Sequence, residues 1–305
     1  MKKFYKNLLI FLIPVFVVWG ITEVFYRTAE NNFTFKNQRI ISEYNQIETL
    51  VFGDSHAFFG INPEYFTSNT FNIANVSQSL YFDELLLKKH IDSLPNLKNV
   101  ILNISYFTLS AVDNSSEDRW RRYFYQQQMN LNIPSIFVFD PSQYSLALVR
   151  RFDKSVDLFG EYLQNGTIVS CYENGFGMQD ETNIVPDKEK IAVMIAKKHE
   201  DHLLDFEVNK NRLQRIIDLC NKNGVAVYLI EMPVYKTYYS LLDTAKKEKI
   251  NATLTNLEEQ NKGVHFFDFS QEESFIDSDF RDADHLTNEG AEKFSKILNA
   301  ILQKK

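Results

Sequence analysis

The sequence predicts a three-layer α/β/α protein, in which a parallel sheet lies between two layers of helices, preceded by a helix that can cross a membrane. Short apolar segments alternate with segments of helical periodicity along most of the chain, as in βα units. The strand candidates are apolar throughout, which is typical of strands covered on both faces. The chain also begins with lysines followed by a long apolar run, the pattern of a membrane anchor.

Length and composition indicate a folded protein with a sizeable core. The chain has 305 residues, of which 44% are hydrophobic and 24% are charged, close to ordinary globular values. Its 26 Phe and 15 Tyr residues require a core, an interface or a ligand groove to cover them. The net charge of −7 and the pI of about 5.5 argue against nucleic-acid binding, which needs a basic face.

The two cysteines, Cys171 and Cys220, stand in no CxxC or zinc-ligand spacing. We therefore expect no metal site, and we also expect no cofactor. A single disulfide between the two thiols, in an oxidising compartment, and two unpaired thiols agree equally well with the sequence.

The N-terminus predicts a membrane anchor. A basic start over residues 1–6 precedes an uncharged run over 8–22, which 24–26 extend to about the length of a span. No small-residue cleavage site follows, which favours an uncleaved anchor over a signal peptide. Basic residues before the span favour a cytoplasmic N-terminus, with the remaining chain outside the cytoplasm. A buried helix of a soluble protein is the weaker interpretation, because the basic-to-apolar order stands at the start of the chain.

Five short apolar segments are predicted strands, and helical spacing of apolar residues predicts helices around them. The strand candidates are 49–53, 71–74, 100–104, 225–230 and 264–269. The helix candidates are 82–94, the stripe 213–220, 236–259 and 288–302. Strands joined by helices in this order form a parallel sheet with right-handed connections.

The expected organisation has three parts. Residues 1–27 form a cytoplasmic tip and the anchor, 28–47 a polar connector, and 48–305 one α/β domain. Residues 106–185 interrupt the alternation with many aromatic side chains. Because this segment is long for a plain connection, we expect an insertion or cap over one edge of the sheet.

Residues 53–56 read Gly-Asp-Ser-His directly after the first predicted strand. Catalytic groups gather at the carboxyl ends of parallel strands, and Gly53 permits a tight turn that would expose the Ser55 hydroxyl. Serine is a poor nucleophile alone and needs an adjacent base. His285, in the loop after the fifth predicted strand, can supply that base, and Asp282 can orient its imidazole.

Two neighbouring residues are weaker candidates. Asp284, beside His285, is an alternative orienting acid, but the spacing favours Asp282. His56 follows Ser55 and could line the same cleft, although a surface or helix-capping position is the favoured interpretation. The alternative without catalysis is that both residues are structural: Ser55 caps one helix and His285 packs at the start of another.

With both motifs in place, the chain resembles the SGNH (GDSL-like) hydrolase superfamily over roughly residues 48–302. The Gly-Asp-Ser triplet ending at Ser55, the Asp-x-x-His quartet ending at His285, and the strand–helix alternation between them carry the resemblance. It implies a flavodoxin-like parallel sheet, with Ser55 as nucleophile, His285 as base and Asp282 as orienting acid. Either motif alone occurs often by chance, whereas the pair in this order and setting is specific.

The resemblance also implies hydrogen-bond donors for the oxyanion of an acyl intermediate. The backbone N–H of Ser55 is the first donor. Ser77 stands where the family has a glycine, and its N–H can donate if the turn tolerates a side chain. In the family's third motif, which corresponds to residues 102–106 here, Asn103 takes the glycine position, and Ser105 replaces the usual asparagine with a shorter reach. A lost oxyanion donor costs about a hundredfold to a thousandfold in rate, so these departures bear on efficiency and reaction type.

Three functions follow from the resemblance and the anchor. The first is an extracytoplasmic O-acyl esterase or O-acyltransferase for an acylated cell-envelope glycan, as in relatives such as the D-alanine transfer protein and polysaccharide O-acetyltransferases. The second is a non-catalytic scaffold that binds glycan, which the altered motifs motivate and the retained Ser55, Asp282 and His285 oppose. The third is a lipase-like enzyme at the membrane surface.

The expected partners follow from the first of these functions. They are an acylated glycan or another acyl ester, the membrane through the N-terminal helix, and a membrane-bound acyl-donor protein. Because the composition is acidic, we expect no nucleic-acid partner.

Overall fold

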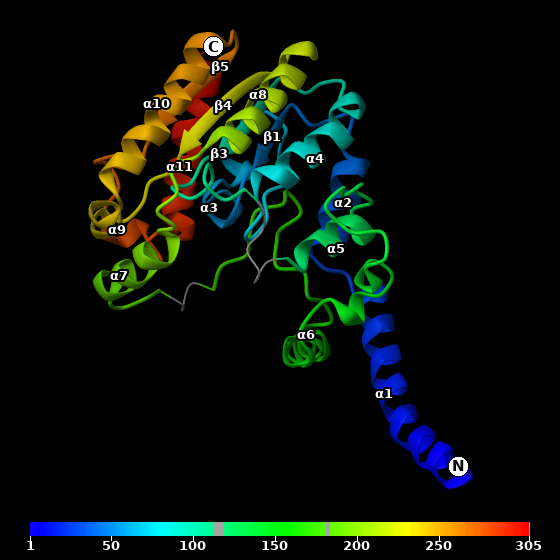
Figure 1. Cartoon of the computed structure of the whole chain (residues 1–305). Helices are drawn as coiled ribbons and strands as arrows, with labels where there is room; N and C mark the ends of the chain where they lie inside the picture. The colour runs from blue at the N-terminus through cyan, green and yellow to red at the C-terminus, as the bar shows by residue number, and fades with distance from the viewer. Residues whose placement is uncertain (113–118, 181–183, 305) are drawn as a thin grey trace. The chain divides into compact units, whose positions relative to one another are not determined.

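The structure is a computed structural model that describes residues 1–112, 119–180 and 184–304 (Figure 1). The chain divides into two compact units. The first comprises Met1–Gln38 and Ser116–Ser170, and the second comprises Arg39–Ser115 and Cys171–Lys305. The aromatic-rich segment expected over 106–185 therefore contributes to both units.

The second unit is built on one parallel sheet of five strands in the order β2-β1-β3-β4-β5. The strands are β1 (Thr49–Phe52), β2 (Thr70–Asn72), β3 (Asn99–Asn103), β4 (Ala226–Glu231) and β5 (Val264–Asp268). This is the flavodoxin-like order, and the predicted fold class is confirmed. The three central strands are buried along most of their length, which explains their uninterrupted apolar sequences.

Helices cover both faces of this sheet (Figure 1). The helices of this unit are α3 (Ser55–Gly60), α4 (Leu80–His90), α7 (Lys188–His199), α8 (Glu207–Lys222), α9 (Lys236–Leu241), α10 (Thr244–Gln260) and α11 (Asn288–Gln303). Short 3-10 helices add η1 (Pro63–Tyr65), η2 (Ile91–Ser93) and η5 (Asp277–Asp279). Helix α4 packs on α8, α3 packs on α11, and α10 packs on β5. The core lies between these helices and the sheet, and its fully buried side chains include Leu50, Phe71, Val100, Leu229 and Phe294.

The predicted single helix over 236–259 is two helices, α9 and α10. Asp243 leaves the helical backbone between them, and its side chain accepts a hydrogen bond from the Lys246 N–H at 2.8 Å. An aspartate at this position caps a helix by satisfying a free N–H group. The helix-forming composition that predicts one helix does not reveal this interruption.

Helices α2 (Asn32–Ser42) and α7 are among those that lie where the sequence predicts none. Helix α2 occupies most of the expected polar connector, and the Asn31 side chain accepts from the Phe33 N–H at 3.0 Å at its start. Helix α7 follows the aromatic-rich segment. Both helices are rich in polar residues, so their apolar periodicity is weak evidence for a helix.

The first unit combines the N-terminal helix with part of the aromatic-rich segment. Its elements are α1 (Lys2–Thr28), the start of α2, α5 (Arg121–Gln128), η3 (Pro141–Gln143), η4 (Leu146–Leu148) and α6 (Phe152–Asn165). Aromatic rings form its core, since Phe33 packs edge-on against Tyr125 at 4.9 Å and Tyr26 against Phe124 at 5.6 Å. Helix α1 is long and apolar enough to span a membrane or to serve as a signal sequence.

Cys171 and Cys220 are buried thiols and are not joined in a disulfide. Burial raises the pKa of the Cys220 thiol to about 12, so this thiol stays protonated near neutral pH. Of the two states that the sequence leaves open, the structure contains the unlinked thiols.

Gly290 lets α11 begin against the backbone of the loop that precedes it. A Cβ at this position would overlap the Asp279 carbonyl group, whereas a Cβ at Gly60 would meet the flexible end of the Met232 side chain. We expect Gly290→Ala to lower the free energy of unfolding by about 1–3 kcal/mol. Gly60→Ala should cost clearly less, because the methionine can move. Urea unfolding of the purified chain measures both, and equal losses would contradict the prediction.

Candidate active site

The loops that follow β1 and β5 meet at the carboxyl edge of the sheet. Ser55 is the first residue of α3 and directly follows β1, while His285 lies in the loop between β5 and α11. The Ser55 Oγ lies 2.8 Å from Nε2 of His285, although the two residues are 230 positions apart. The structure therefore brings the predicted serine and histidine within hydrogen-bond distance.

Two carboxylates hold the other nitrogen of the His285 ring. Nδ1 lies 3.0 Å from Oδ1 of Asp282 and 3.2 Å from Oδ1 of Asp284. Asp282 also accepts hydrogen bonds from the backbone N–H groups of Asp284 at 3.1 Å and His285 at 2.8 Å, which shapes the loop. Both aspartates that the sequence leaves open thus contact the imidazole.

Asp284 is shared between two histidines. Its Oδ2 lies 3.2 Å from Nε2 of His56, and the His56 ring stacks on the His285 ring at 4.8 Å with an interplanar angle of 19°. The side chains of His56 and Asp284 are only 5% and 3% exposed. The favoured interpretation of His56 as a surface or capping residue is wrong, because the first turn of α3 points this side chain into the protein.

Asp54 completes this row of side chains. As the N-cap of α3 it accepts a hydrogen bond from the His56 N–H, and its Oδ1 also lies 2.9 Å from Nδ1 of the same histidine. Gly53 allows this turn to lie close to Asn103, because its φ is +130° and a Cβ there would lie 2.8 Å from the Cβ of Asn103. One feature of the sequence points to this row of side chains: Asp54 and His56 are the two residues that flank Ser55.

The side chains of the third motif contact Asp54. Asn103 Nδ2 donates to Oδ1 of Asp54 at 3.0 Å and to Oγ of Ser105 at 2.9 Å. Ser105 Oγ donates to Oδ2 of Asp54 at 2.7 Å. To serve an acyl oxygen, either side chain would have to give up such a bond, so the oxyanion role of Asn103 and Ser105 stays a prediction.

In the family's second motif, which corresponds to residues 72–77 here, Ser77 has a left-handed backbone conformation, with φ at +56°. This conformation favours glycine, which gives a physical reason for the glycine that the family has at this position. The turn nevertheless accommodates the serine side chain, which is the condition under which the Ser77 N–H can act as a donor. Its role, like that of the Ser55 N–H, stays a prediction.

Charges in this cluster favour protonated histidines. Burial lowers the pKa of His285, but the charge of Asp284 and the hydrogen bonds that the imidazole makes to Asp282 and Asp284 outweigh burial and raise it to about 9. For His56, burial is likewise outweighed by the charges of Asp54 and Asp284, and the pKa is raised well above its ordinary value. Burial alone would raise the pKa of Asp284, yet the two imidazoles hold it well below its ordinary range.

A third histidine lies near the carboxylate of Asp284. His199, the last residue of α7, has its Nδ1 3.8 Å from Oδ2 of Asp284 and 2.8 Å from the Tyr238 hydroxyl. Burial lowers the pKa of His199 to about 4, despite the opposing charge of Asp284. His199 is therefore neutral near pH 7, in contrast to the other two imidazoles.

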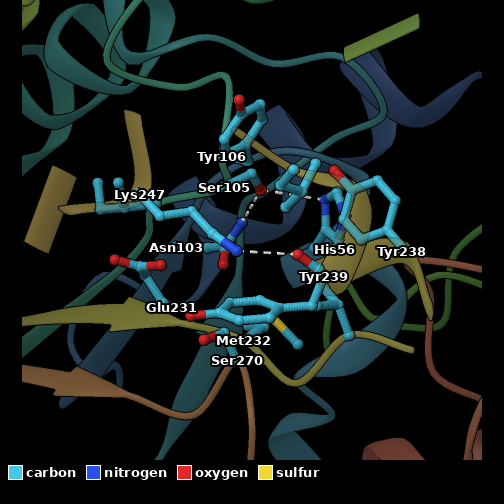
Figure 2. A pocket seen from close by; sticks show the side chains of 13 residues that line it. His56, Asn103, Ser105, Tyr106, Glu231, Met232, Tyr238, Tyr239, Lys247 and Ser270 are labelled. Atoms are coloured by element: carbon cyan, nitrogen blue, oxygen red, sulfur yellow. Dashed lines mark hydrogen bonds between the residues drawn. The ribbon is translucent and has the colours of Figure 1, made fainter. Parts of the chain in front are cut away.

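A cavity of about 30 Å³ lies beside the His56 side of the network (Figure 2). Figure 2 shows the hydrogen-bonded row that runs from Asn103 through Ser105 to His56 along its wall. Two residues that line the cavity have buried oxygens, Asn103 Oδ1 and Glu231 Oε1, with no hydrogen-bond partner among the described residues. Burial and the charge of Asp268 raise the pKa of Glu231 to about 8. The cavity has room for about two water molecules.

His56, Asp284 and His285 are residue types that bind metals, and one ligand atom from each lies within 4.8 Å of the others. In this structure each imidazole instead lies at hydrogen-bond distance from a different oxygen of Asp284, His56 from Oδ2 and His285 from Oδ1, both at 3.2 Å. Zinc would need unprotonated nitrogens about 2.0–2.1 Å from the ion, whereas the carboxylates of Asp54, Asp282 and Asp284 favour protonated imidazoles here. The residues fit a proton-bearing network better than a metal site.

Comparison with known proteins adds little to this geometry. One protein-family model matches residues 192–305, a segment that contains His285 but not Ser55. No curated protein matches the chain. Solved structures similar to it include a candidate platelet activating factor from Streptococcus pneumonia, with 13% identity, a TM-score of 0.41, and coverage of 88% of this chain and 92% of that chain.

Two other similar structures come from Bacteroides. A candidate acylhydrolase from Bacteroides fragilis NCTC 9343 is 13% identical, with a TM-score of 0.40 and coverage of 88% of this chain and 95% of that chain. A GDSL-like lipase from Bacteroides thetaiotaomicron VPI-5482 is 12% identical, with a TM-score of 0.41 and coverage of 88% and 98%. Likeness at this level carries no inference about activity.

The raised pKa of His285 predicts an alkaline pH dependence for any acyl transfer in which it is the base. Only the neutral imidazole can accept the Ser55 proton, and with a pKa of about 9 the neutral form is about 1% of the total at pH 7. We expect kcat/KM for a short acyl ester to rise about tenfold per pH unit between roughly pH 6 and 8 and to level off above about pH 9. A pH-independent rate over this range would contradict the prediction.

The two aspartates should move this profile by different amounts. The charge of Asp284 is the largest influence that raises the His285 pKa. Asp284→Asn should therefore shift the rising limb to lower pH, and the matched variant Asp282→Asn should shift it less. Profiles of kcat/KM from pH 5 to 10 for both variants check the order, and a larger shift for Asp282→Asn would be inconsistent with the structure.

Proposed function

We propose that this protein is a serine esterase or O-acyltransferase that works through an acyl-enzyme on Ser55. The observation that carries the proposal is the 2.8 Å contact between Ser55 Oγ and His285 Nε2, with Nδ1 of His285 facing Asp282 and Asp284. A hydroxyl, an imidazole and an orienting carboxylate in this order activate serine toward acyl carbonyls. A protein that only binds glycan has no physical need for all of these groups.

In the proposed reaction, Ser55 Oγ attacks the carbonyl carbon of an ester, and its proton passes to Nε2 of His285. The carboxylates at Nδ1 stabilise the imidazolium that results. When the tetrahedral intermediate collapses, His285 returns the proton to the leaving alcohol and the acyl group stays on Ser55. Water, or an acceptor hydroxyl, then loses a proton to His285 and takes the acyl group, which restores the serine.

The proposed location is the outer side of a cell membrane, with α1 as a single-span anchor. The basic residues before the apolar run favour this orientation. In this location an acylated cell-envelope glycan is the proposed substrate, and a membrane-bound protein is the proposed acyl donor if the reaction is transfer. These assignments come from the anchor and the resemblance together, and no individual residue of the site selects a glycan.

A non-catalytic glycan-binding protein is the second candidate. One observation favours it: Asn103 and Ser105, two of the predicted oxyanion donors, are hydrogen-bonded to Asp54. With fewer donors for the oxyanion the reaction would be slower by about a hundredfold to a thousandfold for each donor lost. A direct assay of the serine separates the two candidates.

We expect a fluorophosphonate probe to label the purified chain at Ser55 and to label Ser55→Ala not at all. Ser240→Ala is the control, because it removes an exposed hydroxyl on α9 that bonds the Thr237 carbonyl and does not belong to the site, and its labelling should be unchanged. His285→Gln should slow labelling by about 10²–10⁴-fold, since the general base is lost. Peptide mapping by mass spectrometry identifies the labelled residue. Folded protein that resists the probe even at pH 9 would refute the catalytic proposal.

Product analysis distinguishes hydrolysis from transfer. The chain is supplied with a short acyl ester and with or without a glycan acceptor, and the acylated glycan and free acid are measured. Transfer predicts acylated glycan at the expense of free acid, and both products should vanish in Ser55→Ala. Free acid alone would restrict the proposal to an esterase.

A further inference from the structure

We propose that helix α6 lies in the outer interface of the membrane, with its apolar face in lipid beside the outer end of α1. The proposal rests on the membrane anchoring of α1 proposed above. It goes beyond that function, because it assigns lipid as the partner of a second surface, one formed by the aromatic-rich segment of the first unit.

The apolar residues of α6 follow one side of the helix. Phe152, Val156, Phe159 and Leu163 recur at steps of four, three and four residues, which is the spacing of a single helical face. These side chains are 62%, 53%, 39% and 69% exposed, respectively. A contiguous face of large apolar side chains is rare on a protein surface in water and marks a contact with a partner or a membrane.

This face continues into the apolar surface of α1. The two helices together line a groove of about 160 Å³, formed by Val18, Ile21, Thr22, Phe25, Phe152, Ser155, Val156 and Phe159. The Phe25 and Phe159 rings pack edge-on at 5.4 Å. The Tyr26 hydroxyl and Oγ of Ser155 are 2.9 Å apart, a hydrogen bond that holds the buried side of α6 to α1. The exposed face of α6 and the span therefore form one apolar surface.

The part of α1 that meets α6 belongs to the outer end of the proposed span. From residue 8 to residue 26, an α-helix extends about 28 Å, close to the roughly 30 Å thickness of the hydrocarbon layer. Residues 18–25 then lie in the outer part of that layer when the span is inserted. A groove that shares these residues faces acyl chains, so lipid is the occupant that the position of α6 favours.

Polar contacts satisfy the polar side chains of α1 in this outer part of the span. Glu23 pairs with Arg27 and accepts hydrogen bonds from Ser145 Oγ at 2.8 Å and the Ala147 N–H at 3.0 Å. These partners offset the penalty of a carboxylate near lipid. Trp19, a residue type enriched at membrane interfaces, donates from Nε1 to Ser145 Oγ at 3.0 Å.

The charges on α6 indicate which lipids matter. Its polar positions carry the acidic Asp153, Asp157 and Glu161 against the single basic Lys154. The helix therefore offers no net positive charge to anionic headgroups, and apolar burial must drive its association with the membrane. A zwitterionic bilayer should be sufficient.

Fluorescent labels at single introduced cysteines test the proposal. The full chain is reconstituted in phosphatidylcholine vesicles with an NBD label at Leu163→Cys or, as the matched control on the polar face, at Glu161→Cys. The native thiols are buried, and the unsubstituted chain measures any background labelling. We expect nitroxide-labelled phosphatidylcholine to quench the label at 163 at least twofold more than the label at 161, most strongly with a shallow nitroxide. Anionic lipid should leave this ratio unchanged.

A label at Leu9→Cys in α1 separates failure of this proposal from failure of the anchor. Quenching at 9 by a deep nitroxide, together with equal weak quenching at 161 and 163, would overturn the interfacial position of α6 and leave the anchor intact. No quenching at any position would overturn both. Energy transfer between labels at 163 on different chains, in place of lipid quenching, would identify this face as a protein–protein contact and also overturn the proposal.

Discussion

The buried carboxylate of Asp284 between two imidazole rings is the interaction on which the geometry of the site depends. A lone buried carboxylate is unfavourable by several kcal/mol, and here His56 and His285 each supply a hydrogen-bond partner for one of its oxygens. Because His56 belongs to the serine motif and His285 to the C-terminal motif, the two motifs are joined by a second contact besides the one at Ser55. This buried contact keeps the two imidazole rings stacked and nearly parallel. It therefore also fixes the distance between His285 and the Ser55 hydroxyl.

The stacked pair also places opposing influences on the base. The carboxylates of Asp282 and Asp284 favour the charged form of His285, which suits the imidazolium of the proposed reaction, in which Ser55 gives up its proton. The positive charge of His56 acts in the opposite direction and limits how strongly His285 holds a proton. The serine motif thus contributes both the proposed nucleophile and a charge that lowers the basicity of His285.

The sheet and the serine–histidine pair could be predicted because their signals are local. Continuous apolar runs identify buried strands, and parallel strands necessarily bring the residues after them to one edge. The choice between Asp282 and Asp284 could not be made in the same way, because both lie within one turn of His285 and the path of the loop lets both reach Nδ1. The burial of His56 depends on the direction in which the first turn of α3 faces, which a four-residue motif does not encode.

The aromatic-rich segment shows another limit of sequence reasoning. Its length predicts an insertion or cap, which stays a prediction, whereas within the first unit Phe124 and Tyr125 pack against Tyr26 and Phe33 from the N-terminal part of the chain. No periodicity within the segment identifies so distant a partner. The polar helices α2 and α7 escape prediction for a related reason, since tertiary contacts rather than a strong apolar stripe accompany their formation.

The separation of Ser55 and His285 along the chain has a consequence for biogenesis. The serine emerges from the ribosome early, whereas its base arrives only with the loop before α11, and α11 itself packs against α3. A nascent or truncated chain that lacks this helix carries an ordinary, unactivated hydroxyl. Reactivity of Ser55 would therefore report that the second unit has completed its folding, and an immature chain would be protected from reacting with the esters that it meets.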